Sequence, residues 1–95
     1  MSYKYDISEH LEETLKVIYK KDKTLYNAVF KKIEEIISRD ALAIDFYKNL
    51  RNDLKEYKRV HIMKSFVLIF KVYKAEEFIL FERLDHHDNI YKNIK

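Results

Sequence analysis

The 95-residue sequence contains no glycine and no cysteine. Phosphate-binding loops such as the Walker motif and the dinucleotide fingerprint need glycine, because a Cβ would hold the backbone away from phosphate. Without cysteine there are no disulfides, thiolate nucleophiles, zinc fingers or iron–sulfur ligands. These absences predict a protein without a nucleotide cofactor and fit a reducing compartment.

Long apolar segments are also missing. No uninterrupted apolar run approaches the ~18 to 20 residues of a membrane span, and the N-terminus MSYKYDISEH lacks the apolar region of a signal peptide. We therefore expect a soluble, cytoplasmic protein with no membrane partner. Residues 1–95 fit one domain, because a single core usually takes ~100 to 150 residues.

The positive charge lies in the second half of the chain. Residues 1–40 carry eight basic and eight acidic side chains, whereas residues 48–74 carry eight basic and two acidic ones, a local net charge of +6. Tyr57, Phe66 and Tyr73 lie among these cations. Clustered cations and aromatic rings suit a polyanion with stacking bases, although an ordinary lysine-rich surface has the same composition.

Residues 2–38 predict a strand followed by a helical hairpin. Tyr3, Tyr5 and Ile7 alternate with polar residues, which indicates an extended segment over residues 2–7 with these three on one face. Apolar residues then recur at helical spacing from an N-cap at Ser8 to about residue 20. A second helical stripe runs from a cap at Thr24 to about residue 38.

The second half predicts three strands. We assign residues 39–53 to a loop, although their spacing would also allow a short helix. Residues 54–62 alternate, residues 66–73 (FVLIFKVY) are typical of a central strand covered on both faces, and residues 78–84 form the next strand. The short links predict antiparallel hairpins with longer or bulged turns, because no glycine is available.

The predicted fold class is α+β, in the order β-α-α-β-β-β. A helical hairpin packs on one face of an antiparallel sheet of about four strands, and the other face is partly free.

Three histidines lie in the basic half and could carry chemistry on that free face. Period two places Arg59 beside His61, and it places Arg83 with Asp85 and His87 if the last strand continues. RNA cleavage without a metal needs a base for the 2′-hydroxyl, an acid for the 5′-oxygen and cations for the phosphorane. Further candidates are Lys58, Lys64 and His86 as phosphate or RNA ligands, and Tyr91 as a proton donor or stacking ring.

Each of these residues also has a structural interpretation. A single strand histidine such as His61 is usually structural, Tyr91 could simply pack on the sheet, and His10 lies on a charged helix where water would surround it. The segment around His86 and His87, with Asp85 and Asp88, also suggests a divalent metal. Neighbours on an extended chain point in opposite directions, so at most two of the four would reach one ion. We therefore predict no metal site.

The segment YKNLRNDLKEYKRVHIMKSFVLIFKVYKAEEFILFERLDHHDNIYK resembles the C-terminal half of RelE/ParE-superfamily toxins, most closely the YafQ-like branch. The shared features are a Tyr-Lys/Arg-x-x-His segment, an apolar strand ending in Lys, a Phe-Glu-Arg strand, and then a His and a terminal aromatic. The resemblance implies a RelE-like fold and a ribosome-dependent mRNA endoribonuclease, the toxin of a type II toxin–antitoxin pair inhibited by a protein antitoxin. The expected partners are therefore the antitoxin, the ribosome and mRNA.

The resemblance also implies roles for single residues. His61 matches a functional histidine of the YafQ-like branch and His87 its catalytic C-terminal histidine. Tyr91 falls where relatives have a terminal Phe or a catalytic Tyr. Lys58 falls on a basic position of the second strand, and Arg83 precedes the C-terminal site.

Two positions depart from the family pattern. Val67 replaces an arginine that many relatives carry in the central strand, and Ser65 replaces an acidic residue. Either Arg59, Lys64 or Arg83 supplies the missing charge, or catalysis is weak or absent. The leading hypothesis is an mRNA endoribonuclease. The alternatives are a non-catalytic ParE-like inhibitor of a topoisomerase and a degenerate relative that only binds the antitoxin.

Overall fold

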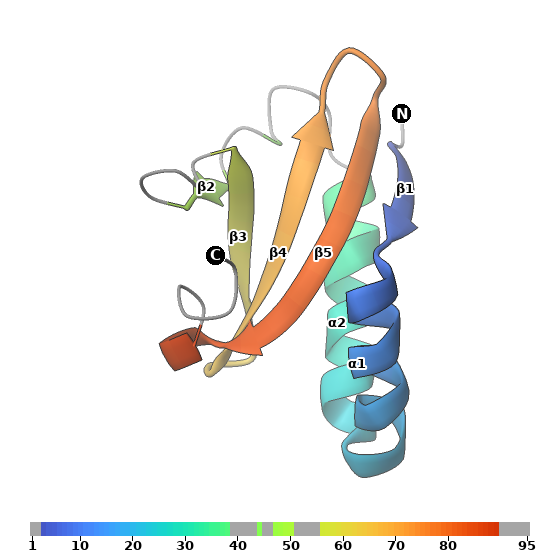
Figure 1. Cartoon of the computed structure of the whole chain (residues 1–95), viewed down its shortest axis with the longest axis vertical. Helices are drawn as coiled ribbons and strands as arrows, with labels where there is room; N and C mark the ends of the chain where they lie inside the picture. The colour runs from blue at the N-terminus through green and yellow to red at the C-terminus, as the bar shows by residue number, and fades with distance from the viewer. Residues whose placement is uncertain (1–2, 39–43, 45–46, 51–55, 90–95) are drawn as a thin grey trace.

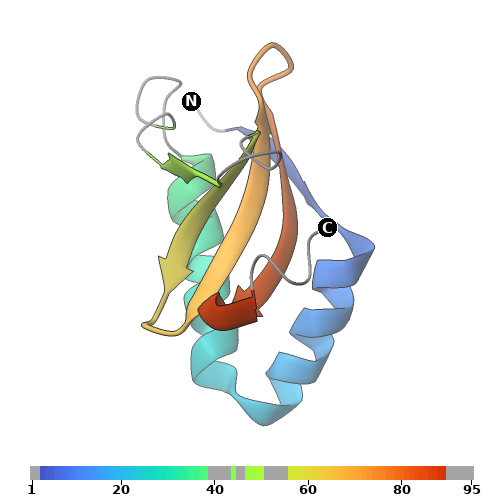
Figure 2. The same cartoon turned by 60° about the vertical axis from the view of Figure 1, so that its left-hand side comes forward.

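The computed structural model describes residues 3–38, 44, 47–50 and 56–89 (Figure 1). The elements follow the order β1 (Lys4–Ile7), α1 (Glu9–Lys21), α2 (Lys23–Ile37), β2 (Lys48–Asn49), β3 (Tyr57–Ile62), β4 (Phe66–Tyr73), β5 (Phe78–His86) and the 3-10 helix η2 (His87–Asn89). The five strands form one sheet in the order β1-β5-β4-β3-β2. Both helices lie on the same side of this sheet (Figures 1 and 2), so the predicted α+β class is confirmed.

The helical hairpin begins at the predicted cap. The Ser8 hydroxyl accepts a hydrogen bond from the Leu11 backbone N–H at 3.1 Å, which satisfies one of the free donors of the first turn of α1. The cap of α2 is not Thr24. Asp22 takes this role, since its Oδ1 accepts from the Leu25 N–H at 3.1 Å and the helix already begins at Lys23. Neither described helix is both long and apolar enough to cross a membrane.

The sheet has two features that the predicted antiparallel sheet of about four strands lacked. A two-residue strand, β2, lies in the segment assigned to a loop and pairs with β3. The first strand is the parallel member of a mixed sheet, with Ile7 opposite Phe81 of β5. Periodicity gives the face of a residue but not the partner of its strand, and this partner lies more than 70 residues away.

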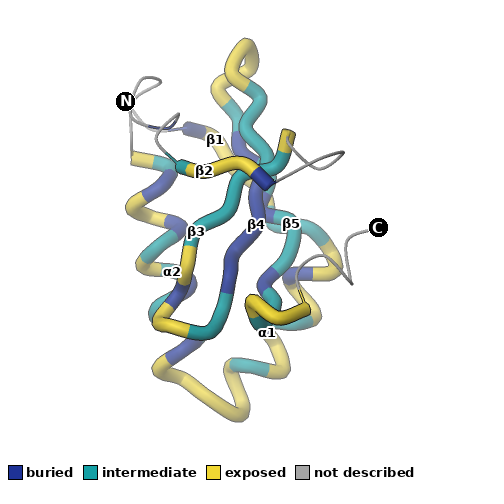
Figure 3. The backbone as a smooth tube through the Cα atoms, turned by 90° about the vertical axis from the view of Figure 1, so that its left-hand side faces the viewer, coloured by how far each residue is buried: buried dark blue, intermediate teal, exposed yellow. Residues whose placement is uncertain are grey.

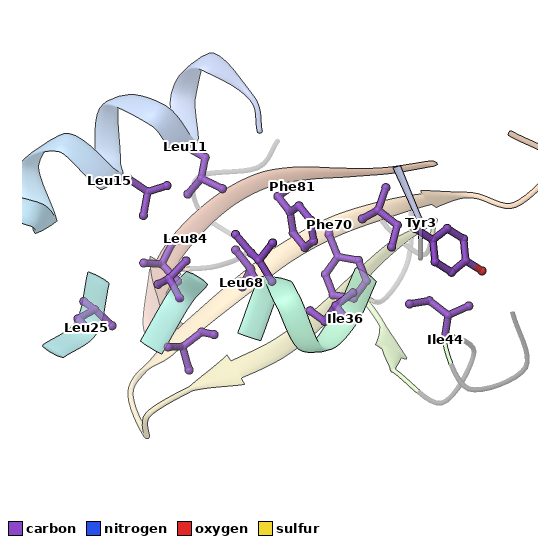
Figure 4. Packing of buried hydrophobic residues seen from close by; sticks show 14 residues of the cluster. Tyr3, Leu11, Leu15, Leu25, Ile36, Ile44, Leu68, Phe70, Phe81 and Leu84 are labelled. Atoms are coloured by element: carbon purple, nitrogen blue, oxygen red, sulfur yellow. The ribbon is translucent and has the colours of Figure 1, made fainter. Parts of the chain in front are cut away.

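The main core lies between the helices and the sheet (Figure 4). Leu11 and Val29 of the helices and Leu68, Phe70 and Phe81 of the sheet are all fully buried. Each such side chain contributes about 1.5 to 3 kcal/mol when it leaves water. Figure 3 shows the buried centre of β4 between more exposed neighbours, which confirms the predicted central strand.

One of the three residues predicted to share a face of the first strand is exposed. Tyr3 is buried, whereas Tyr5 is 44% exposed and its ring meets that of Phe81 edge to face, at 5.9 Å between centroids. The reason is position, because β1 is the edge strand of the sheet.

A β-bulge in β5 decides which residues face away from the helices. Ile69 of β4 lies opposite Arg83, whereas the next residue, Phe70, lies opposite Phe81, so Glu82 has no partner in the ladder. Strict alternation would place Arg83 on the core face with Phe81. The extra residue reverses the alternation and turns Arg83 to the other face.

Each of the two hairpin turns contains a non-glycine residue with a positive φ. Met63, after β3, has φ of 58°, and Glu77, before β5, has φ of 52°. Side chains with a Cβ disfavour this left-handed region by about 1–2 kcal/mol. Each turn therefore carries a steric free-energy penalty that a glycine at Met63 or Glu77 would remove.

Candidate functional site

The sheet face that points away from the helices carries two rows of residues across β3, β4 and β5; we call it the open face. In one row Arg59, Ile69 and Arg83 lie opposite one another, and in the next row His61, Val67 and Asp85 do. Adjacent strands lie about 4.8 Å apart, so β3 and β5 are separated by roughly 10 Å. Two arginine side chains can reach toward each other across that distance.

The floor of the open face is apolar. Val67 and Ile69 are 2% and 1% exposed and form a second small core with Leu50, against which Tyr57 packs. Beside this core a hollow of about 110 Å³ is lined by Tyr57, Ile69, Glu82 and Arg83. The predicted free face is therefore partly covered, with a small polar depression rather than a deep pocket.

An ion pair orients one of the arginines. Arg83 Nη1 lies 3.6 Å from Asp85 Oδ2, and the two side chains are 22% and 21% exposed. The bulge at Glu82 turns Arg83 to the open face, and Asp85 lies on the same face because it is two positions further along the strand. A guanidinium carries five N–H donors in a planar fork, a shape that suits the oxygens of an anion such as phosphate.

A lysine adds to the positive charge of this face. Lys71 lies opposite Tyr57 on β3, and its Nζ lies 3.1 Å from Glu56 Oε1 and 5.1 Å from the centre of the Tyr73 ring. The hydrogen bond to Glu56, followed by the attraction of nearby negative charge, raises the pKa of Lys71 above its usual value. Lys71 therefore stays charged throughout the physiological pH range.

The 3-10 helix η2, which begins at His87, lies at the end of the sheet beside the β3–β4 turn (Figures 1 and 2). The His87 backbone N–H donates to the Ser65 carbonyl at 2.8 Å, and its ring Nδ1 lies 3.4 Å from the same oxygen. A carbonyl oxygen only accepts, so this contact is a hydrogen bond when Nδ1 carries the ring proton, and the neutral ring then has its lone pair on Nε2. Nε2 lies 3.1 Å from Asp88 Oδ1.

His86 belongs to the opposite face of β5. It pairs with Phe66, and the two rings meet edge to face at 5.9 Å. Its ring also stacks on that of His87, with 4.9 Å between centroids and 26° between planes. His86 therefore packs against the ring of His87 and does not lie in the rows of the open face.

The structure brings together some of the predicted site residues. Arg59, His61 and Arg83 share the open face, and His61 and His87 lie at the same end of the sheet. Within the described part of the chain, His61 has no side-chain hydrogen bond or ion pair. The expected continuation of β5 through His87 does not occur, because the strand ends at His86.

Two further predicted residues, Lys58 and Lys64, lie away from the rows of the open face. Lys58 is on the helix-facing side of β3, where its Nζ donates to Tyr47 O at 3.2 Å and Asn49 Oδ1 at 2.9 Å. The same alternation that places Arg59 on the open face requires this. Lys64 is exposed in the β3–β4 turn, and Tyr91 lies outside the described residues.

Val67, the position at which the resemblance led us to expect an arginine, is buried in the row between His61 and Asp85. Arg59 and Arg83 occupy the adjacent row and bring two guanidinium groups to the same face. The sequence-based interpretation did not name Lys71 as a site residue, and it considered Asp88 only as a possible metal ligand. Lys71 alternates with Ile69 and Val67, so period two alone could have placed it on the open face.

Three known proteins give the most informative comparisons; no protein-family model matches the sequence. The chain is 44% identical over 93 residues to a Methanocaldococcus jannaschii protein named as the toxin RelE4, covering 98% of this chain and 95% of that protein. The fold is similar to that of an Escherichia coli YafQ variant, with a TM-score of 0.71 at 19% identity over 94% of this chain and 98% of that one. It is also similar to a chain of the RelBE2 toxin–antitoxin complex from Mycobacterium tuberculosis, with a TM-score of 0.70 at 19% identity over 90% and 92% of the two chains.

Proposed function

Because the chain belongs to the RelE family of toxins, we propose that it is the toxin of a type II toxin–antitoxin pair and cleaves ribosome-bound mRNA by metal-independent acid–base catalysis. The observation that carries the proposal is the pair of cross-strand rows on the open face. The rows contain Arg59, Arg83 and His61, and His61 lies at the end of the sheet where His87 lies.

The proposed reaction uses the 2′-hydroxyl of the RNA as nucleophile. One imidazole, of His61 or His87, removes the proton from this hydroxyl as its oxygen attacks the neighbouring phosphorus. The other imidazole donates a proton to the 5′-oxygen as its bond to phosphorus breaks. The products are a 2′,3′-cyclic phosphate and a free 5′-hydroxyl, and the balance needs no metal or other reactant.

In the proposed reaction, the cations of the open face bind the scissile phosphate and stabilise its negative charge. Arg59 and Arg83 approach from opposite strands and stabilise the additional negative charge of the phosphorane. Lys71, with its raised pKa, adds a fixed positive charge to the same face. Tyr57 and Tyr73 lie beside it and offer rings on which bases can stack.

The small size of the hollow favours a substrate that arrives already positioned. A depression of about 110 Å³ cannot enclose a nucleotide, since ligand pockets usually measure about 300–1,000 Å³. A ribosome that presents one strand of mRNA at a fixed place would supply this positioning. The partner that inhibits the toxin is proposed to be an antitoxin that covers the open face, consistent with the complex in which the similar Mycobacterium chain is found.

The test is expression of the chain alone, followed by mapping of RNA 5′ ends. We expect new ends within the codons of translated messages and none in the same message without its start codon. Cleavage should persist in EDTA when polyamines keep the ribosomes intact. Intact messages would contradict the proposal; DNA breaks would then indicate a ParE-like inhibitor, and normal growth a degenerate toxin.

A further inference from the structure

We propose that His86, His87 and Asp88 form a binding site for a divalent transition-metal ion of the zinc, nickel and copper class. One ligand atom from each of the three residues lies within 4.8 Å of the other two. An extended chain would allow only alternate residues to share an ion. Here β5 ends at His86 and η2 begins at His87, and this change of backbone stacks the two neighbouring rings on each other.

One of the three ligand pairs already lies at a distance that suits an ion. Metal–ligand bonds of about 2.0–2.1 Å hold adjacent donor atoms roughly 3.0–3.4 Å apart. Asp88 Oδ1 lies 3.1 Å from His87 Nε2, within this range, whereas the other carboxylate oxygen, Oδ2, lies 3.5 Å from His86 Nδ1. Rotation about side-chain bonds must bring the ligand atoms closer together, starting from separations within 4.8 Å.

Backbone groups contact one nitrogen of each ring. Asp88 N–H donates to His86 Nδ1 at 3.3 Å, so this nitrogen acts as an acceptor, and a metal ion would replace the N–H as its partner. His87 Nδ1 faces the Ser65 carbonyl, which leaves the lone pair of the neutral ring on Nε2. Asp88 carboxylate oxygens lie within 3.5 Å of both nitrogens, and a cation between nitrogen and oxygen, either a proton or a metal ion, stabilises such a contact. A backbone carbonyl on the far ring nitrogen is also the usual support of a metal-binding histidine.

The ligand set selects the ion. Two imidazoles and one carboxylate favour zinc, nickel and copper, whereas magnesium and calcium prefer all-oxygen sites. The His86, His87 and Asp88 side chains are 40%, 51% and 71% exposed, so an ion reaches them directly from solvent. Water completes the coordination, and copper should bind more tightly than nickel or zinc.

Metal binding at this place would inhibit cleavage, a consequence that rests on the proposed function. An ion on Nε2 of His87 occupies the lone pair that the proposed reaction uses for proton transfer. The ion would therefore act as an inhibitor and not as a cofactor. A rise in free zinc would hold the toxin inactive even without its antitoxin.

The binding test uses the full chain without an affinity tag, titrated with zinc chloride and followed by NMR of the imidazole nitrogens. We expect the signals of His86 and His87 to shift, while those of His10, exposed on α1, stay constant. By calorimetry, His86→Ala and Asp88→Ala should each weaken zinc binding by ~10-fold or more, and His10→Ala should not. Magnesium should produce no shift. Equal shifts at His10, or unchanged affinity in both site variants, would overturn the proposal.

The inhibition test compares cleavage with and without zinc for each variant. Zinc should lower the cleavage rate of the unaltered chain by ~10-fold or more, and Asp88→Ala should need a ~10-fold higher zinc concentration for the same effect. Zinc bound at the site without loss of cleavage would overturn the inhibitory role. If the chain does not cleave RNA at all, the proposed function fails, whereas the binding test still decides the metal site.

Discussion

The Ser8 hydroxyl donates a 2.5 Å hydrogen bond to the backbone carbonyl of Glu82, although the two residues are 74 positions apart. The same oxygen caps α1, and the Ser8 N–H donates to the Phe81 carbonyl at 2.9 Å. Ser8 thus joins the start of the helical hairpin to the bulge that turns Arg83 to the open face.

Removing this hydroxyl should destabilise the protein beyond the loss of a cap. Ser8→Ala loses the bond to Leu11 N–H and leaves the Glu82 carbonyl without its partner, so we expect the free energy of unfolding to fall by about 1–3 kcal/mol. Urea denaturation measures this. Ser38→Ala is the matched control, because its hydroxyl makes only a local bond at 2.9 Å to Glu35 O on an exposed helix end. Equal losses in the two variants would mean that the bulge does not depend on Ser8.

The two arginines of the open face should matter more for cleavage than Lys58. Arg59→Ala and Arg83→Ala should each lower the cleavage rate of ribosome-bound mRNA by ~10-fold to 1,000-fold, the usual effect of losing a group that stabilises charge in the transition state. Lys58→Ala removes a cation from the same strand but from the opposite face, so its effect should stay within about threefold. A Lys58 effect as large as that of Arg59 would contradict the assigned face.

His87→Ala should lower cleavage by ~100-fold or more, as expected for the loss of a general acid or base. The variant should remain folded, because the side chain is half exposed and its backbone bond to Ser65 persists. Mapping of message ends with the two proteins at equal concentration measures the effect. His10→Ala is the control, and normal cleavage by His87→Ala would rule out the assigned role.

Replacing Glu77 by glycine should stabilise the protein. Glu77 has φ of 52°, and its backbone bonds to Lys74 and Lys4 do not depend on the side chain. Glycine removes the steric penalty, so the free energy of unfolding should rise by about 1 kcal/mol. Glu76→Gly makes the same chemical change one residue earlier, without a positive φ, and should be neutral or destabilising. A loss of stability in Glu77→Gly would contradict the strain at this turn.

The pair formed by Lys71 and Glu56 should give the unfolding free energy a dependence on alkaline pH. The hydrogen bond raises the pKa of Lys71, so its contribution is fully present below the ordinary pKa of 10.5 and is lost as the pH rises through the raised value. Glu56→Gln should therefore destabilise the protein at pH 8 and not at strongly alkaline pH. An NMR titration of the Lys71 side chain should show its pKa return toward the ordinary value in this variant. An unchanged pKa would exclude the assigned cause.

The fold could be predicted where the pattern of the sequence is local. Helical spacing located the hairpin, the Ser8 cap was readable from its position before the first apolar stripe, and β4 stood out as a continuous β-branched and aromatic run. The partner of β1 was not readable, because pairing across most of the chain depends on the whole assembly. The two-residue β2 is too short to show any period.

The site could be predicted as far as the strands continue regularly. Alternation placed Arg59 and His61 on one face and would also have placed Lys58 on the other. It placed Arg83 with Asp85 only because they are two residues apart, since the bulge at Glu82 leaves no mark in the sequence. The approach of His86, His87 and Asp88 to one another was missed because it depends on the chain leaving the strand at His87.

The pairing of β1 with β5 determines when the sheet can be completed during synthesis of the chain. β1 is synthesised first but cannot pair until β5 has been synthesised, since Ile7 lies opposite Phe81. Arg83 belongs to that final strand and needs Ser8, near the beginning, to hold the bulge before it. A nascent chain therefore has no complete open face until β5 has been synthesised and has paired with β1.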